Sequence, residues 1–459
     1  MARDEYDTVV IGAGVAGLAA GRVLATAGQR VAIVEARDRI GGRIFTQRVP
    51  LPGARGILPI ELGAEFIHGL PAETWALVEE AGLATYELQG SQLSFARNHL
   101  QKNDAPHHAA INVLEDLKRA TQARPEHDMS FADYLAHAGI DAVDAEPAAA
   151  YVEGFNAADR TIIGTAALAE QQRAEDEIQG DRLFHVRSGY DQIPQVLARG
   201  IERTGAPILL DRHVRQVTWR EGAVSIHAED SAKLESTLHA KRAVVTLPLG
   251  VLHAGSTRFD PEPASLIGHA RRMRMGAVVR ATLVFSSRFW RDGELAITRS
   301  DLATELKNLS FLFTSQLTPA TWWTATPEDS PIITGWVGGP KAEMLQNRLR
   351  AGGATDTLLT VCLRTLSMAF GMSERALNQR LTSWHAHDWS ADEHARGAYS
   401  YVPAGALDAS DKMSTPVAGT LYFAGEHTDT SGHWGTVHGA LRSGLRAARQ
   451  VLLDAGSRS

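Results

Sequence analysis

Six residues near the N-terminus have the types and spacing of a phosphate-binding turn. The run Gly12-Ala13-Gly14-Val15-Ala16-Gly17 is G-x-G-x-x-G, and it lies between residues 6–11, which favour a buried strand, and the Ala- and Leu-rich residues 15–27, which favour a helix. The first glycine permits a tight turn, the second lets a pyrophosphate approach the backbone, and the third allows close helix–strand packing. Free N–H groups and the helix dipole would then hold the phosphates. The pattern predicts a dinucleotide site.

Glu35, Arg37 and a second glycine turn follow within reach of the same ligand. Glu35 ends the next predicted strand, residues 30–35, at the distance expected of a carboxylate that accepts ribose hydroxyls. Arg37 and Gly41-Gly42-Arg43 come just after it. Because a guanidinium binds two phosphate oxygens at once, these arginines suit a pyrophosphate. The strand–turn–helix–strand order is a βαβ unit, and it predicts an α/β protein with a Rossmann-like dinucleotide-binding domain.

With these residues the chain resembles the flavin-containing amine oxidase family of monoamine oxidases, polyamine oxidases and lysine-specific histone demethylases, in a short form of bacterial type. The FAD-binding start of that family is G-x-G-x-x-G, then Glu, then G-G-R. Further blocks that resemble the family are Glu61-Leu62-Gly63-Ala64-Glu65-Phe66-Ile67-His68-Gly69, Gly189-Tyr190, Phe423-Ala424-Gly425-Glu426-His427-Thr428, Thr436-Val437-His438-Gly439-Ala440 and Ser443-Gly444. Clear motifs are missing only from residues 86–147 and 292–350.

The resemblance implies that the chain binds FAD. The cofactor-binding residues that it implies are Gly12, Gly14, Ala16, Gly17, Glu35, Ala36, Arg37, Gly42, Arg43, Gly63, Ala64, Glu65, Val214, Gly425, Glu426, Thr436 and Val437. Val214 would hold the adenine through its backbone, and Val437 would open a helix whose positive N-terminus points at the flavin ring. The single cysteine, Cys362, lies in a predicted helix, away from the C-terminal loop to which monoamine oxidases attach their flavin. Noncovalent FAD is therefore expected.

Aromatic and histidine side chains are the candidates for the substrate side. Tyr399 resembles the aromatic residue that the family places before the flavin, where a ring grips a cationic amine and excludes water. Thr436 stands where several relatives have a second aromatic ring, and Trp434 could supply that ring instead. His68 matches a histidine of animal polyamine oxidases. An imidazole that titrates near neutrality could take a proton from the incoming ammonium, although a structural histidine fits the sequence nearly as well.

Arg280 is the main departure from the family. Residues 274–285 resemble the strand that carries the family's lysine, which holds a water against flavin N5, and Arg280 takes the position of that lysine. Strand alternation puts Arg280 on one face with Val278 and Thr282, an unusual place for a charge unless it lines a cavity. Arginine can hold a water and keep positive charge there, but it cannot act as a base. The substitution puts the oxygen half-reaction in doubt.

The expected function is oxidation of a primary or secondary amine, polyamine-like amines included, to an imine that hydrolyses to an aldehyde or ketone, with O2 reduced to H2O2. Two alternatives stay open: a flavin dehydrogenase or desaturase acting on a non-amine, and a flavin-binding scaffold with little turnover, which Arg280 motivates. L-amino acid oxidation is disfavoured because residues 65–68 replace the arginine-bearing segment of that branch. No metal site is expected, since His385 and His387 share a predicted strand face without further ligands.

Length and composition set the remaining expectations. A chain of 459 residues exceeds one ordinary domain. The motifs predict two interleaved domains: an FAD-binding domain in residues 1–85, 182–260 and 405–459, and an α+β substrate-binding domain in residues 86–181, with a helical pattern, and 261–404. A formal charge of −7 argues against nucleic acid, and neither a signal peptide nor a membrane span is expected. We expect a cytoplasmic monomer or homodimer whose partners are a small amine and O2.

Overall fold

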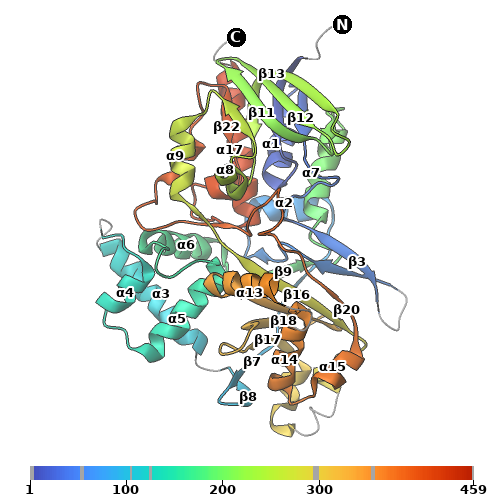
Figure 1. Ribbon diagram of the computed structural model, residues 1–459, viewed down its shortest axis with the longest axis vertical. Coiled ribbons are helices and arrows are strands. Elements are labelled where there is room, and N and C mark those ends of the chain that lie inside the picture. Colours follow the sequence, from blue (N-terminus) through green and yellow to red (C-terminus); the bar gives the residue numbers. More distant parts are fainter. Residues whose placement is uncertain are drawn as a thin grey trace.

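The largest sheet carries the N-terminal glycine turn. The structure, a computed structural model, describes residues 5–51, 56–103, 106–123, 127–292, 299–352 and 357–456. The eight strands of this sheet are β10 (Ile208–Leu209), β2 (Val31–Val34), β1 (Glu5–Ile11), β13 (Glu235–Val245), β12 (Ala223–Glu229), β11 (His213–Arg220) and β14 (Arg258–Asp260), in that order, with β22 (Leu421–Phe423) paired to β13. The pairs β10–β2, β2–β1, β1–β13 and β13–β22 are parallel. Three distant parts of the chain therefore build one sheet (Figure 1).

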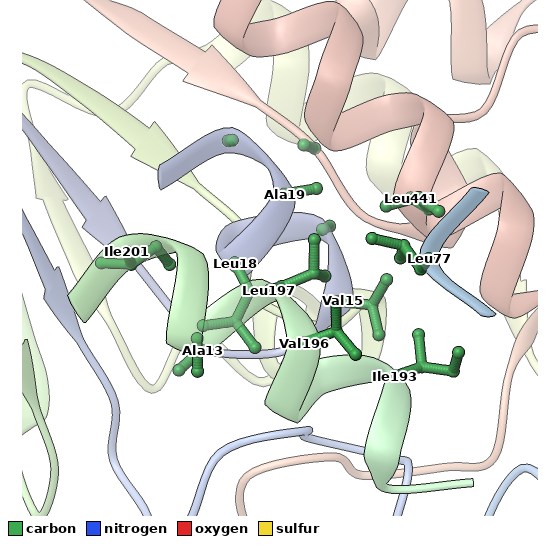
Figure 2. Close-up of a cluster of buried hydrophobic side chains, with 14 of the residues drawn as sticks. Ala13, Val15, Leu18, Ala19, Leu77, Ile193, Val196, Leu197, Ile201 and Leu441 are labelled. Carbon is green, nitrogen blue, oxygen red and sulfur yellow. The ribbon is translucent and has the colours of Figure 1, made fainter. Parts of the chain in front are cut away.

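Helices with small, apolar surfaces cover one face of this parallel region. They are α1 (Val15–Thr26), α2 (Ala72–Glu80), α7 (Gln192–Glu202) and α17 (Val437–Gly456). Figure 2 shows Leu18 and Val15 of α1 among Leu197 and Ile193 of α7, with Leu441 of α17 beside them. A side chain at Gly444 of α17 would place its Cβ 2.1 Å from the carbonyl oxygen of Ala16, so the two helices touch through their backbones. This packing fixes the first helical turn of α1 against α17.

A second, seven-stranded sheet occupies the opposite end of the molecule (Figure 1). Its strands, in order, are β20 (Leu381–His385), β16 (Val278–Phe285), β19 (Ile332–Gly338), β18 (Thr321–Thr324), β17 (Leu309–Phe313), β7 (Ser91–Ala96) and β8 (His99–Lys102). The helices α13 (Pro340–Ala351), α14 (Leu358–Phe370) and α15 (Glu374–Arg380) accompany it. Every residue of β16 is buried, which is why its sequence is apolar on both faces apart from Arg280 and Thr282.

The helical pattern expected for residues 86–181 is wrong at its beginning. Strands β6 (Thr85–Glu87), β7 and β8 occupy residues 85–102, and β7 pairs in parallel with β17, more than 200 residues away. A pairing over that distance leaves no local periodicity. The remainder is helical, as α3 (Pro106–Ala123), α4 (Phe131–His137), α5 (Ala142–Asn156) and α6 (Thr165–Ile178). These helices form the group at one side of the seven-stranded sheet in Figure 1.

Shorter elements connect these layers. Strand β9 (Leu183–Val186) joins β5 (Ile67–His68) to β6, and β3 (Thr46–Pro50) pairs with β4 (Ile57–Glu61). The other elements are α8 (Leu249–Ala254), α9 (Ala264–Arg272), β15 (Arg274–Met275), α10 (Phe289–Asp292), η1 (Ser300–Leu302), α12 (Ala303–Lys307), β21 (Ser400–Tyr401), α16 (Ala409–Ser414) and η2 (Glu426–Thr428). The predicted mixed α/β fold class is confirmed. Within the described ranges, no helix is both long and apolar enough to cross a membrane.

Candidate active site

One cavity of about 1420 Å³ gathers the predicted site residues. Its wall is built from the glycine turns of the eight-stranded sheet, from β16, β18 and β19 of the seven-stranded sheet, and from α3, α5 and α6. Of the residues that the sequence suggested for cofactor binding or catalysis, all line this cavity except Gly17. The cavity is larger than the ~300–1,000 Å³ usual for one small ligand. It has room for a dinucleotide and a substrate together.

The first glycine turn leaves a cradle in front of α1. A Cβ built on Gly14 meets no described atom within 4 Å, whereas a Cβ on Gly17 would lie 1.9 Å from the carbonyl oxygen of Gly12. Gly14 is thus open toward the cavity, and Gly17 is the glycine required for packing. No described side chain caps the N-terminus of α1, and its first turn has no acidic residue. The N–H groups of this turn remain available to an anion.

Glu35 joins the first glycine turn to the second. Its carboxylate is buried and accepts hydrogen bonds from the Ala13 N–H at 2.7 Å and from the Arg37 N–H at 2.9 Å. The Gly41 N–H donates to the Ala13 carbonyl at 2.8 Å, so the second turn lies directly beside the first. Val214 is in the same end of the cavity, at the start of β11. These residues fit the pyrophosphate and adenosine half of a dinucleotide.

The two arginines expected at the phosphates both have carboxylate partners. Arg37 donates hydrogen bonds from both of its terminal nitrogens to the Asp392 carboxylate, at 2.8 and 2.7 Å. Arg43 donates to Glu426 at 2.9 Å and to the carbonyl of Ala398 at 2.8 Å. Both arginines line the cavity, and each also ties the N-terminal segment to residues more than 350 positions away. Asp392 was missed from the sequence, because no motif surrounds it.

Glu426 is the centre of a buried hydrogen-bond network. It accepts from Arg43, from the Ser400 hydroxyl at 2.5 Å and backbone N–H at 3.2 Å, and from the Gly435 N–H at 3.0 Å. Burial opposes ionisation of this carboxyl, but Arg43, His427 and the Ser400 hydroxyl outweigh it and hold its pKa below the usual range. Glu426 is therefore an ionised side chain that joins Arg43 to the loops around Ser400 and Gly435.

Tyr399 and the loop before α17 line the same cavity. The Tyr399 hydroxyl donates to the Phe155 carbonyl at 2.7 Å, and its ring lies against Gly435, where a Cβ would be 2.9 Å from the ring. Trp434 is buried, and its indole N–H donates to the Asp429 carbonyl at 2.9 Å. Thr436 Oγ1 accepts from the Gly439 N–H, and α17 begins at Val437 as the sequence predicted. The rings of Tyr399 and Trp434 thus both border the cavity.

His68 lies in the cavity wall with a lower pKa than expected. The sequence left open an imidazole that titrates near neutrality and a structural histidine; burial lowers the pKa of His68 to about 4, which favours the second. Its ring meets Phe66 and Phe155 edge-on, at centroid distances of 6.0 and 5.8 Å, and Nδ1 finds no partner among the described residues. The aromatic surroundings disfavour the imidazolium. His68 is a neutral side chain at neutral pH.

Arg280 lines the cavity as its position on β16 suggested. It is 5% exposed and donates to the Gly63 carbonyl at 2.8 Å and to Glu65 Oε2 at 2.5 Å. The indole N–H of Trp323 donates to the same Glu65 oxygen at 3.1 Å. Trp323 comes from the stretch without motifs and could not be found from the sequence. Arg280 is consequently one half of an ion pair.

A group of acidic side chains also lines the cavity. They come from α3, α5, α6 and the turn after α6, and they are Glu115, Glu146, Glu153, Glu175, Asp176 and Asp181. Most have cationic neighbours: Lys118 binds Glu115 and Asp176, and Arg160 binds Glu146 and Glu153. Glu175 differs, because its Oε1 is buried without a hydrogen-bond partner in the described part of the chain, and burial raises its pKa to about 7.

The histidines considered as metal ligands have other neighbours. His385 Nδ1 lies 3.1 Å from Gln47, and His387 Nε2 lies 2.8 Å from Asp392, so these two do not form a pair. His213, Glu393 and His394 each place one potential ligand atom within 4.8 Å of the others. The Arg215 guanidinium, however, lies 3.3 Å from His213 Nε2 and brings a positive charge to the same cluster. We assign no metal to it.

The fold and the site together define the class of protein. A parallel sheet that carries a glycine cradle and Glu35, next to a cavity lined by the rings of Tyr399 and Trp434, is typical of a dinucleotide-dependent oxidoreductase. The sequence profile of the family described as flavin containing amine oxidoreductase matches residues 15–452. The chain belongs to this family and is an FAD-dependent amine oxidoreductase, as the N-terminal and C-terminal motifs predicted.

Relatives agree with this assignment, and solved structures share the fold. The chain is 26% identical to polyamine oxidase 4 of Oryza sativa subsp. japonica, over 98% of this chain and 90% of that protein. It is also 26% identical to lysine-specific histone demethylase 1 homolog 1 of Arabidopsis thaliana, over 99% of this chain but only 53% of that protein. Its fold is similar to putrescine oxidase bound to putrescine (TM-score 0.79, 20% identity, 98% and 99% of the two chains). It is equally similar to cyclohexylamine oxidase from Brevibacterium oxydans IH-35A (TM-score 0.79, 22% identity, 98% and 100%).

Proposed function

We propose that this enzyme oxidises a small primary or secondary amine, with diamines and polyamines included, to an imine, and that O2 is the final electron acceptor and leaves as H2O2. The observation that carries this proposal is one cavity whose lining includes the glycine cradle, the ring of Tyr399 and the acidic side chains of α3, α5 and α6. An ammonium group is attracted by carboxylates and by aromatic faces alike. A neutral hydrocarbon substrate would leave Glu175 buried without a partner.

In this proposal the side chains that line the cavity have separate roles. FAD, when bound, would accept a hydride equivalent from the carbon beside the amine nitrogen. Tyr399 and Trp434 would orient the amine and exclude water. His68, neutral at neutral pH, is a weak acceptor for the proton of an ammonium, so its part in the proposal is to orient the nitrogen by a hydrogen bond.

Noncovalent attachment of FAD is part of the proposal. The single cysteine of the chain, Cys362, is fully buried in α14 among the core residues of the seven-stranded sheet, and its pKa is raised to about 12 by burial. A thiol in that state is a poor nucleophile. Denaturation should therefore release free FAD into the supernatant.

A second candidate function is supported by one observation. Because Arg280 is paired with Glu65, the cavity has no unpaired cation at the position where the resembling enzymes have a lysine. This favours a dehydrogenase that reduces its flavin with an amine but transfers electrons slowly to O2.

An amine panel distinguishes the proposals. The purified holoenzyme is mixed anaerobically with mono-, di- and polyamines, and flavin absorbance is followed before and after air is admitted. Bleaching by an amine, fast recolouring and stoichiometric H2O2 support the oxidase. Bleaching with slow recolouring supports the dehydrogenase, and no bleaching by any amine contradicts both.

A further inference from the structure

The guanidinium of Arg280 has little freedom. Nη1 is held by the Gly63 carbonyl at 2.8 Å and Nη2 by Glu65 Oε2 at 2.5 Å, and the guanidinium carbon lies 5.6 Å from the centre of the Trp323 ring. The side chains of Arg280 and Glu65 are 6% and 11% exposed. A pair so poorly exposed is screened weakly by solvent, so each charge acts strongly on the other.

Glu65 is held from three sides. Besides Arg280, the Trp323 indole N–H donates to Oε2 at 3.1 Å, and His185 Nδ1 lies 3.5 Å from Oε1. The ring of Tyr86 stacks on His185 with centroids 4.8 Å apart and planes 3° apart, which fixes the imidazole against the carboxylate. Burial lowers the pKa of His185, so it adds no positive charge at neutral pH. Arg280 and Glu65 are the two buried charges of this contact and they sum to zero; Arg187, nearby, is more exposed and paired with Glu328.

This pair stands between two cavities. Arg280, Glu65 and Trp323 line the large cavity, and the same three residues line a second cavity of about 60 Å³ behind them. Glu61 also lines the second cavity; burial raises its pKa to about 8, so it is mostly uncharged at neutral pH. Its carboxyl accepts from the Thr46 hydroxyl at 2.7 Å and from the Tyr190 N–H at 2.8 Å. Glu61 is therefore a suitable control for Glu65, because it is a buried carboxyl of the same cavity that takes no part in the ion pair.

We propose that Glu65 neutralises Arg280 and thereby lowers both the reduction potential of the bound flavin and its affinity for anions. This inference rests on the proposed function and on one placement, that of the flavin ring in the cavity beside Arg280, which takes the position of the lysine in the resembling enzymes. Reduced flavin carries negative charge, so an unpaired cation beside the ring would favour reduction, and a cation cancelled by a carboxylate would not. Glu65 acts through Arg280 and is a positioning residue.

The test uses sulfite, which binds oxidised flavin as an anion and needs no amine. The holoenzyme and its variants are titrated with sulfite, and the flavin midpoint potential is measured with a reference dye. E65Q leaves Arg280 unpaired and should tighten sulfite binding about tenfold, the effect of about 1.4 kcal/mol, with a more positive potential. R280Q leaves Glu65 unpaired and should weaken sulfite binding by a similar factor, with a more negative potential.

Two further variants separate charge from structural damage. The double variant E65Q/R280Q restores neutrality and should return both readouts to within about threefold of the wild type. E61Q alters a carboxyl that is already largely uncharged at pH 7 and should leave both unchanged. Shifts in the same direction for E65Q and R280Q, or none in either, overturn the proposal. If E65Q does not retain FAD, the comparison of R280Q with the double variant tests the proposal, and sulfite should bind more tightly to the double variant. If the holoenzyme shows this pattern of shifts but oxidises no amine, the proposed function is refuted and the inference about Glu65 stands.

Discussion

Arg37 and Asp392 form a two-point ion pair across 355 residues of sequence, with N–O distances of 2.8 and 2.7 Å. Asp392 is also bound by His387 at 2.8 Å and accepts the His394 N–H at 2.9 Å. The pair fastens the segment after β20 to the end of β2, beside Glu35. Arg37, two positions after Glu35, thus closes the wall of the cavity.

Replacing Asp392 by Asn should destabilise the apoprotein. Burial opposes ionisation of Asp392, but hydrogen bonds from His387 and Arg37 hold its pKa below the usual range, so it is ionised at neutral pH. Removing one partner of a poorly exposed pair costs about 3 kcal/mol in the free energy of unfolding. Because the folded pKa is depressed, this contribution is present above pH ~4 and is lost as the pH falls further. Urea unfolding at pH 7 measures it.

D388N is the matched control, because Asp388 lies on the same segment but is half-exposed and its Oδ2 lies 3.4 Å from Arg350. It should cost less than about 1 kcal/mol. Equal losses in D392N and D388N would contradict a special role for the Arg37 pair.

Two glycines of the first turn should respond differently to alanine. At Gly17 a Cβ would lie 1.9 Å from a backbone oxygen, so G17A must move the turn and should cost about 2 kcal/mol or more of apoprotein stability. At Gly14 no described atom lies within 4 Å of a Cβ. G14A should therefore fold normally and lose at least tenfold in FAD affinity, because its methyl group occupies the place proposed for the pyrophosphate. Melting curves of the apoprotein and fluorescence titration with FAD separate the two; a G14A variant that binds FAD normally would move the phosphates elsewhere.

Local sequence was sufficient for the features that depend on neighbouring residues. The glycine turn, Glu35 after β2 and the start of α17 at Val437 all lie where the pattern put them, because backbone conformation and helix ends are set within a few positions. The apolar run of residues 278–285 likewise predicted the strand β16.

The ion-pair partners of the charged residues could not be predicted from neighbouring sequence. Arg280 stood out as a charge in an apolar strand, but its carboxylate, Glu65, is 215 residues away, and Arg43 and Glu426 are separated by 383. Nothing near either residue signals the other. His68 shows the same limit for acidity, since the burial that lowers its pKa involves Phe155, which belongs to α5, far along the chain. Geometry across elements, which sequence spacing does not encode, determines the charge state of the site.

Buried histidines should make the protein sensitive to acid. Burial lowers the pKa of His427 to about 4, and neither of its ring nitrogens has a partner among the described residues. Between pH 6.5 and 4 the unfolded chain takes up a proton there and the folded chain does not, so the free energy of unfolding falls as the pH falls, by up to about 1.4 kcal/mol per pH unit for this group. H427L removes the titration without removing a hydrogen bond, and should flatten the slope in urea melts from pH 7 to 5. H227Q, at an exposed histidine of β12, should keep the wild-type slope; a steep slope in H427L would show that other groups dominate.

Substitutions of Tyr399 should separate its ring from its hydroxyl. Y399F loses only the bond to the Phe155 carbonyl, which lies away from the reacting carbon in the proposed function, so kcat/KM for the best amine should fall less than about fivefold, the effect of a hydrogen bond worth ~1 kcal/mol. Y399L keeps an apolar side chain but loses the aromatic face, and should raise KM for a cationic amine about tenfold, since a desolvated cation–π contact is worth up to ~2 kcal/mol. Steady-state kinetics with FAD saturation verified by absorbance measure both. If Y399L and Y399F behave alike, the ring of Tyr399 does not contact the amine, and the wall formed by Trp434 would have to hold it instead.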